Sequence, residues 1–344
     1  MAIIDKPNEY FNTVLYTGTG ATQSITGVNF TPDLTWIKGR SGATEHVLTD
    51  SVRGVTKEIS SNDTGAEETV AQGLTAFGSD GFTVGTDGSY NTSSATYSSW
   101  NWKASNTTAV SNTDGSITSS VSANTTAGFS IVSYTGTGAS ATVGHGLSSA
   151  PSMIIIKNRD SGVTGWITYH KSFTTTGNYL QLQSTNAVAT NIGYYSSAPS
   201  TTVINIGASG YVNEPSEDYI AYCFADVKGY SKFGSYTGNG NADGTFVYTG
   251  FKPAFVLAKR ATTAGENWTI YDNKRNDYNP VLKLLYPDSS GAEASAPNTY
   301  DFLSNGFKLR SSDGRENLSG ATFIYMAFAE NPFVTSSGVP ATAR

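Results

Sequence analysis

Short stretches in which apolar and polar residues alternate run along the whole chain and end in turns rich in Gly, Asn and Ser. The most apolar of them lie at residues 97–102, 219–224 and 323–328. Because successive side chains of a strand point to opposite faces, every second residue shares a face. One face then carries the bulky pairs Trp100 and Trp102, Tyr222 and Phe224, and Met326 and Phe328. We expect this face to pack on a second layer, and the two later strands, apolar on both faces, to be central in their sheets.

A longer pattern occurs three times: Tyr-Thr-Gly-X-Gly, an interval, then Pro, five mostly apolar residues and Lys. The copies begin at Tyr16, Tyr134 and Tyr236, and the Pro precedes the Lys by 6 residues in each. Self-similarity at such constant spacing indicates a repeat architecture. With several short strands per repeat, it predicts an all-β protein of three tandem β-sandwich (jelly-roll-like) repeats of about 100 residues. The Gly-X-Gly segments resemble phosphate loops, but no helix-forming stretch follows them, so we predict hairpin turns.

The predicted organisation follows this repeat. It comprises an N-terminal arm at 1–10, repeats at 11–104, 128–226 and 231–330, a Ser/Thr/Asn-rich segment at 105–127 and an extended C-terminal arm at 331–344. The segment at 105–127 is either a linker or a pair of polar edge strands. Residues 66–74 have weak helical character and predict one short helix. Repeats two and three should pack rigidly, with repeat one hinged more loosely, and ordered arms would contact neighbouring subunits.

Composition narrows the class of protein. Charged residues make up 14% of the chain, below the roughly 25% of typical soluble domains. The net charge of −6 and the absence of any Lys/Arg cluster argue against a nucleic-acid partner. No apolar run approaches the length of a membrane helix, so we expect no membrane insertion. The first residues lack the apolar segment of a signal peptide. Cys223 lies in an apolar run and reads as a small buried hydrophobe.

Residues that could carry chemistry do not recur at equivalent repeat positions. His46, His145 and His170 occupy different places, and no metal-ligand spacing is present. Their predicted role is packing or hydrogen bonding. A glycosidase needs two carboxylates flanking one bond. The acidic groups at Glu67-Glu68 and at 214–218 are not repeated. We therefore expect no catalytic residues, no metal and no cofactor.

The Lys that ends each repeated apolar strand has two interpretations. Lys38, Lys157 and Lys259 could form a charged rim that meets an anionic partner or a sugar. The favoured alternative is a strand end whose long stem covers apolar surface while the amine reaches water. Trp166 and Trp268 each follow the Lys by nine residues and begin a Trp-X-X-Tyr pattern. An aromatic ring there could stack on a sugar, although a core strand is favoured. The candidate ligand-binding residues are Trp166, Tyr169, Trp268, Tyr271, Lys157 and Lys259.

Residues 129–170, which read FSIVSYTGTG…VGHGL…APSMIIIKNR…GWITYH, resemble a repeat domain of tail-fibre-like virion structural proteins of marine and other tailed bacteriophages. The runs YIAYCFADVKGYSKFGSYTGNG and FLSNGFKLRSS…IYMAFAENPF resemble the same family, as do PDLTWIKGR and DSVRGVTKEISSN of the first repeat. The resemblance implies a β-rich virion component with no established catalytic residues. The chain departs from a long fibre in having no heptad or collagen-like shaft.

Two functions remain open from the sequence. The first is a tail fibre or receptor-binding protein that contacts host surface glycan without catalysis. The second is a head, neck or tail decoration or adaptor protein with no ligand of its own. A polysaccharide-degrading depolymerase is less favoured, because the repeats show no carboxylate cleft. The expected partners are other virion proteins, further copies of the chain (three if it is a fibre) and host surface polysaccharide. The expected location is the virion, after synthesis in the host cytoplasm.

Overall fold

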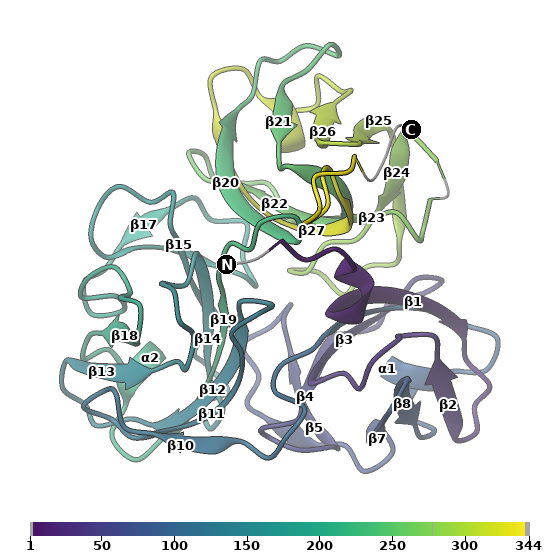
Figure 1. Ribbon diagram of the computed structural model, residues 1–344. Helices are drawn as coiled ribbons and strands as arrows, with labels where there is room; N and C mark the ends of the chain where they lie inside the picture. The colour runs from purple at the N-terminus through teal and green to yellow at the C-terminus, as the bar shows by residue number, and fades with distance from the viewer. Residues whose placement is uncertain (1–2, 277, 341–344) are drawn as a thin grey trace.

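The fold is all-β, as the alternating pattern predicts. The computed structural model describes residues 3–276 and 278–340. Every pair of neighbouring strands in its sheets is antiparallel, and the helices in this part of the chain are single turns. The sheets fall into three groups that follow the chain order, which we call lobe 1 (11–102), lobe 2 (110–224) and lobe 3 (231–332). Figure 1 shows the three lobes arranged around a common centre.

Lobe 1 consists of a large sheet, a small sheet and a short helix, α1 (Gly88–Asn91). A single 3-10 turn, η1 (Pro7–Glu9), precedes it. The large sheet has the order β1 (Phe11–Thr17), β9 (Thr96–Trp102), β3 (Leu34–Gly39), β4 (His46–Asp50), β5 (Lys57–Ser60) and β6 (Glu68–Thr69). The small sheet has the order β2 (Gln23–Thr26), β8 (Gly81–Val84) and β7 (Leu74–Gly78). The helix predicted at 66–74 is wrong: strand β6, a turn and the start of β7 occupy this segment.

Lobe 2 repeats this plan with extra strands at one edge. Its large sheet has the order β10 (Val110–Asn112), β11 (Ser119–Asn124), β12 (Phe129–Thr135), β19 (Asp218–Phe224), β14 (Met153–Asn158), β15 (Ile167–His170), β16 (Asn178–Gln181) and β17 (Ala189–Thr190). Its small sheet pairs β13 (Ala141–Gly144) with β18 (Val203–Ile206), and α2 (Gly210–Asn213) follows. The polar segment 105–127 contributes β10 and β11 to the large sheet. It is therefore a pair of polar strands rather than a free linker.

Lobe 3 has two sheets of four strands. The large sheet has the order β20 (Ser231–Thr237), β27 (Thr322–Pro332), β22 (Phe251–Arg260) and β23 (Thr269–Asp272). The small sheet has the order β21 (Phe246–Tyr248), β26 (Gly306–Leu309), β25 (Ala294–Leu303) and β24 (Val281–Leu284), and α3 (Gly314–Asn317) precedes β27. The closing strands β9, β19 and β27 each pair on both sides, so all three are central in their sheets.

Each large sheet buries both of its faces. One face packs on the small sheet of its own lobe, and the other faces a core shared by all three lobes. The bulky face predicted for the closing strands is this shared side. Trp102, Phe224 and Phe328 lie in mutual contact at the centre, with ring centroids 5.7–6.1 Å apart. The second layer expected beneath the bulky face is therefore supplied by the other two lobes.

The Tyr-Thr-Gly-X-Gly segments are not hairpin turns. Each connects the large sheet of its lobe to the small sheet, because β1 and β2 pair with different neighbours. In lobe 2 the Tyr134 hydroxyl donates to the carbonyl of Val212 (2.7 Å), and Thr137 N donates to Asn213 Oδ1 (2.7 Å). A Cβ on Gly136 would lie 2.1 Å from the carbonyl oxygen of Glu214, so only glycine fits there. The motif is thus a loop that docks on the short helix.

The two arms fold back on their own chain. Ile4 N donates to the carbonyl of Lys228 (3.3 Å), and Phe333 N donates to the carbonyl of Gly250 (3.1 Å). The arms also meet each other, since Ser336 N donates to Asp5 Oδ1 (2.7 Å). Contacts within the chain therefore suffice to hold the described parts of both arms, and contact with neighbouring subunits stays a prediction. The ends of both predicted arms, residues 1–2 and 341–344, lie outside the described residues.

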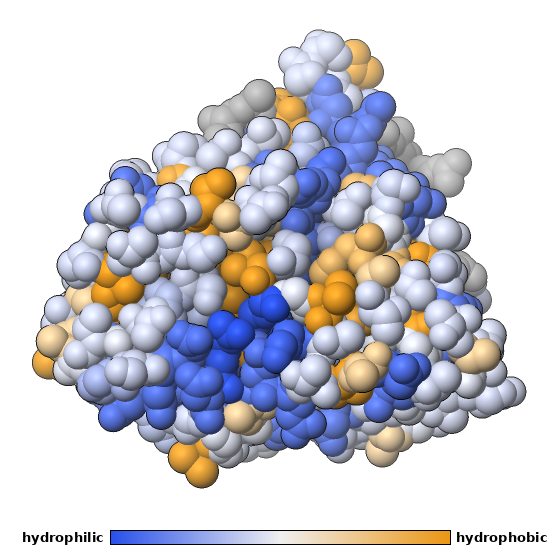
Figure 2. All heavy atoms as spheres, turned by 90° about the horizontal axis from the view of Figure 1, so that it is seen from below, coloured by the Kyte–Doolittle hydropathy of each residue, from blue (hydrophilic) through white to orange (hydrophobic). Residues whose placement is uncertain are grey.

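Across the described part of the chain, no helix has the length and apolar character needed to span a membrane. On the face in Figure 2, hydrophilic side chains gather in the lower part of the view and toward the upper right, and small groups of apolar side chains lie between them and around the edge. Apolar side chains scattered singly are normal for a protein surface and do not by themselves mark a binding site.

Candidate functional site

The aromatic residues predicted to stack on sugar are mostly buried. Trp166 and Trp268 are 0% and 1% exposed. The indole of Trp166 donates to the carbonyl of Ser60 in lobe 1 (2.8 Å), and that of Trp268 donates to Gln181 in lobe 2 (3.0 Å). Tyr271 is also buried, and its hydroxyl donates to Glu316 Oε1 (2.8 Å). Of these aromatic residues only Tyr169 is partly exposed. The prediction of a sugar platform there is wrong, because neighbouring lobes cover the two tryptophans and Tyr271 lies in the core of its own lobe.

The strand register explains why one lobe lacks this tryptophan. Asp50, His170 and Asp272 pair with Leu34, Met153 and Phe255, each of which lies two residues after the Pro of the repeated pattern, so they are equivalent. Four residues earlier in each lobe stand His46, Trp166 and Trp268. His46 thus takes the tryptophan position, where its Nδ1 accepts a hydrogen bond from the Trp36 indole (3.0 Å). Burial lowers the pKa of His46 well below its usual value. All three histidines are buried, in keeping with their predicted packing role.

The three lysines that end the repeated strands do not reach water. Lys38, Lys157 and Lys259 are at most 1% exposed. Their ammonium groups donate to main-chain carbonyls, namely those of Gly39 (2.8 Å) and Ser290 (3.2 Å), Asn158 (2.7 Å) and Ser161 (3.1 Å), and Thr185 (3.2 Å) and Glu266. Desolvation lowers the pKa of each to about 8. Neither the charged rim nor the solvated strand end describes them, because loops cover the amines.

A buried ionic network joins lobes 1 and 2. Asp50 and Arg53 form a fully buried ion pair, and the Tyr222 hydroxyl of lobe 2 donates to Asp50 Oδ2 (2.8 Å). Arg53 also contacts Glu67 (3.3 Å), and Glu67 accepts two hydrogen bonds from Arg159 of lobe 2 (2.9 and 3.0 Å). Glu67, considered from the sequence as a surface carboxylate, is therefore the link between two arginines.

A second ionic network with an equivalent arrangement joins lobe 3 to lobe 1. Asp272 pairs with Arg275 and accepts a hydrogen bond from the Trp100 indole of lobe 1 (3.0 Å). Glu293 contacts Arg275 (3.4 Å) and accepts two hydrogen bonds from Arg40 of lobe 1 (2.8 and 3.0 Å). Sequence reasoning missed this pair of networks, although the Asp-X-X-Arg spacing occurs in both 50–53 and 272–275.

The junction of lobes 2 and 3 replaces these charges with apolar groups. By register, His170 and Phe173 stand where Asp272 and Arg275 stand in lobe 3. Val188 N donates to the carbonyl of Ala261 (2.8 Å), as Glu67 N does to Arg159 (2.7 Å) and Glu293 N to Arg40 (2.9 Å). His170 Nε2 lies 3.2 Å from the carbonyl of Tyr325 in lobe 3. Three equivalent junctions thus close a ring, two of them ionic and one mainly apolar.

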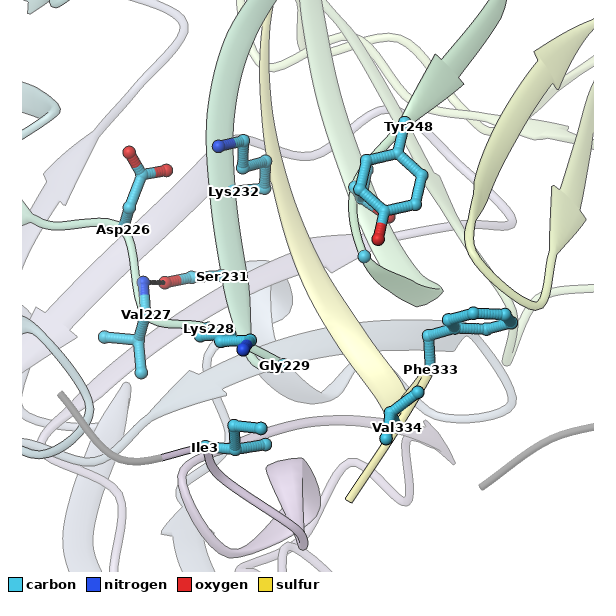
Figure 3. A pocket seen from close by; sticks show the side chains of 12 residues that line it. Ile3, Asp226, Val227, Lys228, Gly229, Ser231, Lys232, Tyr248, Phe333 and Val334 are labelled. Carbon is cyan, nitrogen blue, oxygen red and sulfur yellow. Dashed lines mark hydrogen bonds between the residues drawn. The ribbon is translucent and has the colours of Figure 1, made fainter. Parts of the chain in front are cut away.

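A cavity that we call the seam cavity lies beside the lobe 2–lobe 3 connection and both arms (Figure 3). It has a volume of about 650 Å³. Tyr248, which is 60% exposed, presents its ring to the cavity, and Phe333 and Val334 lie below it. Lys232 lies on the facing strand. None of these residues was predicted from the sequence, because they come from distant segments and follow no local motif.

The polar groups of the seam cavity favour a negatively charged ligand. Its one carboxylate, Asp226, is occupied by an ion pair with Lys171 and by Phe233 N, which donates to Asp226 Oδ1 (2.8 Å). Within the described residues, Lys228 and Lys232 make no ion pair. The cavity therefore combines two available ammonium groups, an exposed aromatic ring and an apolar floor. Pockets of this kind bind small molecules by apolar contact and a few placed polar groups.

No described group of three or more His, Cys, Asp or Glu residues is arranged to hold a metal ion. Together, the fold and the seam cavity define a three-lobed β-sandwich protein with a surface cavity suited to binding. The chain belongs to the DUF7483 family, a domain of unknown function, whose match covers residues 6–332. No curated protein matches the chain.

Proposed function

We propose that the protein is a non-catalytic virion structural component that contacts an acidic saccharide of the host surface through the seam cavity. The resemblance of residues 129–170 and of two later runs to tail-fibre-like virion proteins supports the virion assignment. The exposed ring of Tyr248 above a cavity with two available lysines supports the ligand class. The partners would be other virion proteins and further copies of the chain.

The chemistry of the seam cavity suits a sugar that carries a carboxylate or sulfate. A pyranose presents an apolar C–H face that packs on an aromatic ring such as Tyr248. Its anionic group would pair with the ammonium of Lys232 or Lys228, whose charges no described carboxylate neutralises. The apolar floor of Val227, Val334 and Ile3 excludes water from part of this contact.

The test is a calorimetric titration of the full chain with carboxylated or sulfated oligosaccharides and, separately, with neutral ones. Tyr248→Ala should weaken binding of the acidic sugar about fivefold or more, because stacking contributes on the order of 0.5–1.5 kcal/mol beyond the buried area. Lys232→Gln should weaken it and reduce its salt dependence. Phe246→Ala, an exposed aromatic change on the same strand, is the matched control. Equal binding by Tyr248→Ala and the parent chain would exclude this cavity.

A second function, decoration or adaptor duty without a ligand, is favoured by one observation. The two tryptophans and Lys259, which were expected to face a ligand, instead bond to a neighbouring lobe. Antibody labelling of intact particles in the electron microscope separates the two. Label at the tail tip or fibres would favour host recognition, and label on the head or neck would favour decoration. Unlabelled particles would contradict the virion assignment itself.

A further inference from the structure

A second cavity lies between lobes 3 and 1 at the place that corresponds to the seam cavity. Lys232 of the seam cavity and Asn12 of the second cavity are the second residues of β20 and β1. Asp226 and Glu330 each follow the Phe-Ala pair near the end of a closing strand. The second cavity has a volume of about 270 Å³, and we call it the amide cavity. Its asparagines are Asn8, Asn12, Asn29, Asn273 and Asn331.

At the third junction, between lobes 1 and 2, the chain itself occupies the corresponding place. Asp33 of lobe 1 accepts hydrogen bonds there from Ser51 Oγ (2.7 Å), Ala104 N (2.7 Å) and Asn106 N (3.1 Å). The chain segment that leaves β9 therefore covers this position and satisfies its polar groups. The amide cavity differs because several of its polar groups are left without partners among the described residues.

Three buried polar atoms of the amide cavity have no hydrogen-bond partner among the described residues, and one of them, Glu330 Oε2, lies in an ion pair with Lys252. Thr13 is 4% exposed, and its hydroxyl is unpaired. Asn273 Oδ1 is also buried and unpaired. Buried polar groups are nearly always paired with protein or ordered water, so each unpaired group requires an explanation. Thr13 and Asn273 come from different lobes and both line this cavity, which indicates a place for a hydrogen-bonding guest.

The remaining groups define the kind of guest. The side-chain amides of Asn8, Asn29 and Asn331 make no hydrogen bond within the described part of the chain. Each amide offers two donors and an acceptor, which match the paired donors and acceptors of adjacent hydroxyl groups. The lining contains one cation, Lys274, and one anion, Glu330, and Glu330 is paired with Lys252 (2.8 Å). The lining therefore carries no net charge.

We propose that the amide cavity binds one neutral sugar ring through the Thr13 hydroxyl and the side-chain amides of Asn273 and Asn331. The small volume accommodates a single ring, and the seam cavity takes the acidic part of the same class of ligand. In naming a host saccharide as the source, this inference rests on the proposed function. The two cavities are distinct, because they share no lining residue.

The test is saturation-transfer NMR of the full chain with neutral hexoses at millimolar concentration. Thr13→Val preserves shape and removes the unpaired hydroxyl, so it should weaken hexose binding at least about fivefold without lowering the thermal midpoint. Thr35→Val is the matched control, since Thr35 is another buried threonine of lobe 1 with an unpaired hydroxyl but lies outside the cavity. Asn331→Ala is a second variant, at a half-buried position, and should also lose binding.

The outcomes separate this inference from the proposed function. Hexose binding that survives Thr13→Val and Asn331→Ala, or that is lost in Tyr248→Ala, would overturn the amide cavity as the site. Failure of every neutral hexose to bind would also overturn it, while acidic saccharide binding sensitive to Tyr248→Ala would leave the proposed function intact. If the parent chain binds neutral hexoses but no acidic saccharide, and Thr13→Val weakens the hexose binding, the proposed ligand of the seam cavity is overturned. The inference about the amide cavity then stands.

Discussion

At the scale of single residues, the repeated Tyr-Thr-Gly-X-Gly motif is a set of contacts with a second motif that sequence reasoning missed. That second motif is Gly-X-X-Asn, which forms α1, α2 and α3 and ends in Asn91, Asn213 and Asn317. Each Asn side chain accepts a hydrogen bond from the backbone of the Gly-X-Gly loop (2.7–2.9 Å). The two motifs lie more than 70 residues apart in sequence, so spacing within either one could not reveal the partner.

Gly136→Ala should destabilise the protein, because the new Cβ would lie 2.1 Å from a carbonyl oxygen that belongs to the backbone. Forcing such a contact costs about 1–3 kcal/mol, occasionally more. Gly42→Ala is the control: a Cβ there meets nothing within 4 Å, so stability should stay within about 0.5 kcal/mol. Urea unfolding of both variants measures the difference. Equal midpoints would show that the loop adapts and that the glycine is not required by sterics.

The three buried lysines predict an increase in stability with pH. Their folded pKa values of about 8 lie below the unfolded value near 10.5. Between these values the unfolded chain holds protons that the folded chain has released, so the free energy of unfolding rises. The gain is on the order of 1–3 kcal/mol per lysine from about pH 8 to about pH 10. Above that range the buried tyrosines, whose pKa values are raised by burial, reverse the trend.

Urea unfolding across this pH range measures the effect, and lysine-to-methionine variants assign it. Lys38→Met should remove roughly a third of the rise, and changing all three lysines should abolish it. A rise of full size in the triple variant would show that other groups titrate in this window.

At the scale of elements, the two-residue period of a strand predicted the closing strands of the three lobes well. It did not predict the contacts between lobes. The alternation at 97–102, 219–224 and 323–328 identified three strands and their buried bulky faces, because that pattern depends only on local geometry. The helix at 66–74 was wrong because Glu68 is paired in a strand with Glu58. Junction residues such as Arg159 and Glu67 come from different lobes, and no local pattern encodes which lobe lies opposite.

Because local patterns do not show which residues the rest of the chain covers, the residues predicted to bind a ligand were mostly wrong. Trp166, Trp268, Tyr271, Lys157 and Lys259 were identified by their position in the repeat. That position places the two tryptophans at lobe junctions, Tyr271 in the core of its own lobe and the two lysines under loops. The seam cavity and the amide cavity collect residues from several connections and both arms, so the sequence gives no spacing by which to find them.

Glu67→Gln should weaken the junction of lobes 1 and 2 strongly. It removes the charge between Arg53, which is fully buried, and Arg159, whose side chain is 18% exposed. Leaving a buried charge without its partner costs about 3–5 kcal/mol. Arg53 keeps its pair with Asp50 and Arg159 still reaches water, so we expect a loss of about 2–3 kcal/mol, at or below the lower end of that range. Glu9→Gln, in an exposed pair with Lys6, should leave the unfolding midpoint unchanged. A loss as small as that of Glu9→Gln would mean that the network contributes little.

At the scale of the whole molecule, the shared core makes the three lobes one folding unit. Trp102, Phe224 and Phe328 touch one another, and each belongs to a different lobe. Lobe 1 has two ionic junctions and its own share of this core, so the structure gives it no looser attachment than the others. We therefore expect the lobes to unfold together in a single transition.

Phe224→Ala should cost about 3–5 kcal/mol, because it leaves a hole in a core that cannot collapse from one side alone. The loss should lower hydrogen-exchange protection in all three lobes rather than in lobe 2 only. Native-state hydrogen exchange measured lobe by lobe tests this. Protection lost only within 110–224 would show that the lobes open independently.

The closed ring of lobes has a consequence for how the sequence can change. In an assembly of three identical chains, every substitution appears three times, and a change that suits one interface must suit all of them. Here the three positions are encoded separately, which lets one junction hold His170 and Phe173 where another holds Asp272 and Arg275. At the junction of lobes 1 and 2 the chain covers the corresponding place. The amide cavity between lobes 3 and 1 is lined with asparagines, and the seam cavity between lobes 2 and 3 is lined with two lysines. Joining three similar units in one chain thus lets them diverge around a centre that stays common to all.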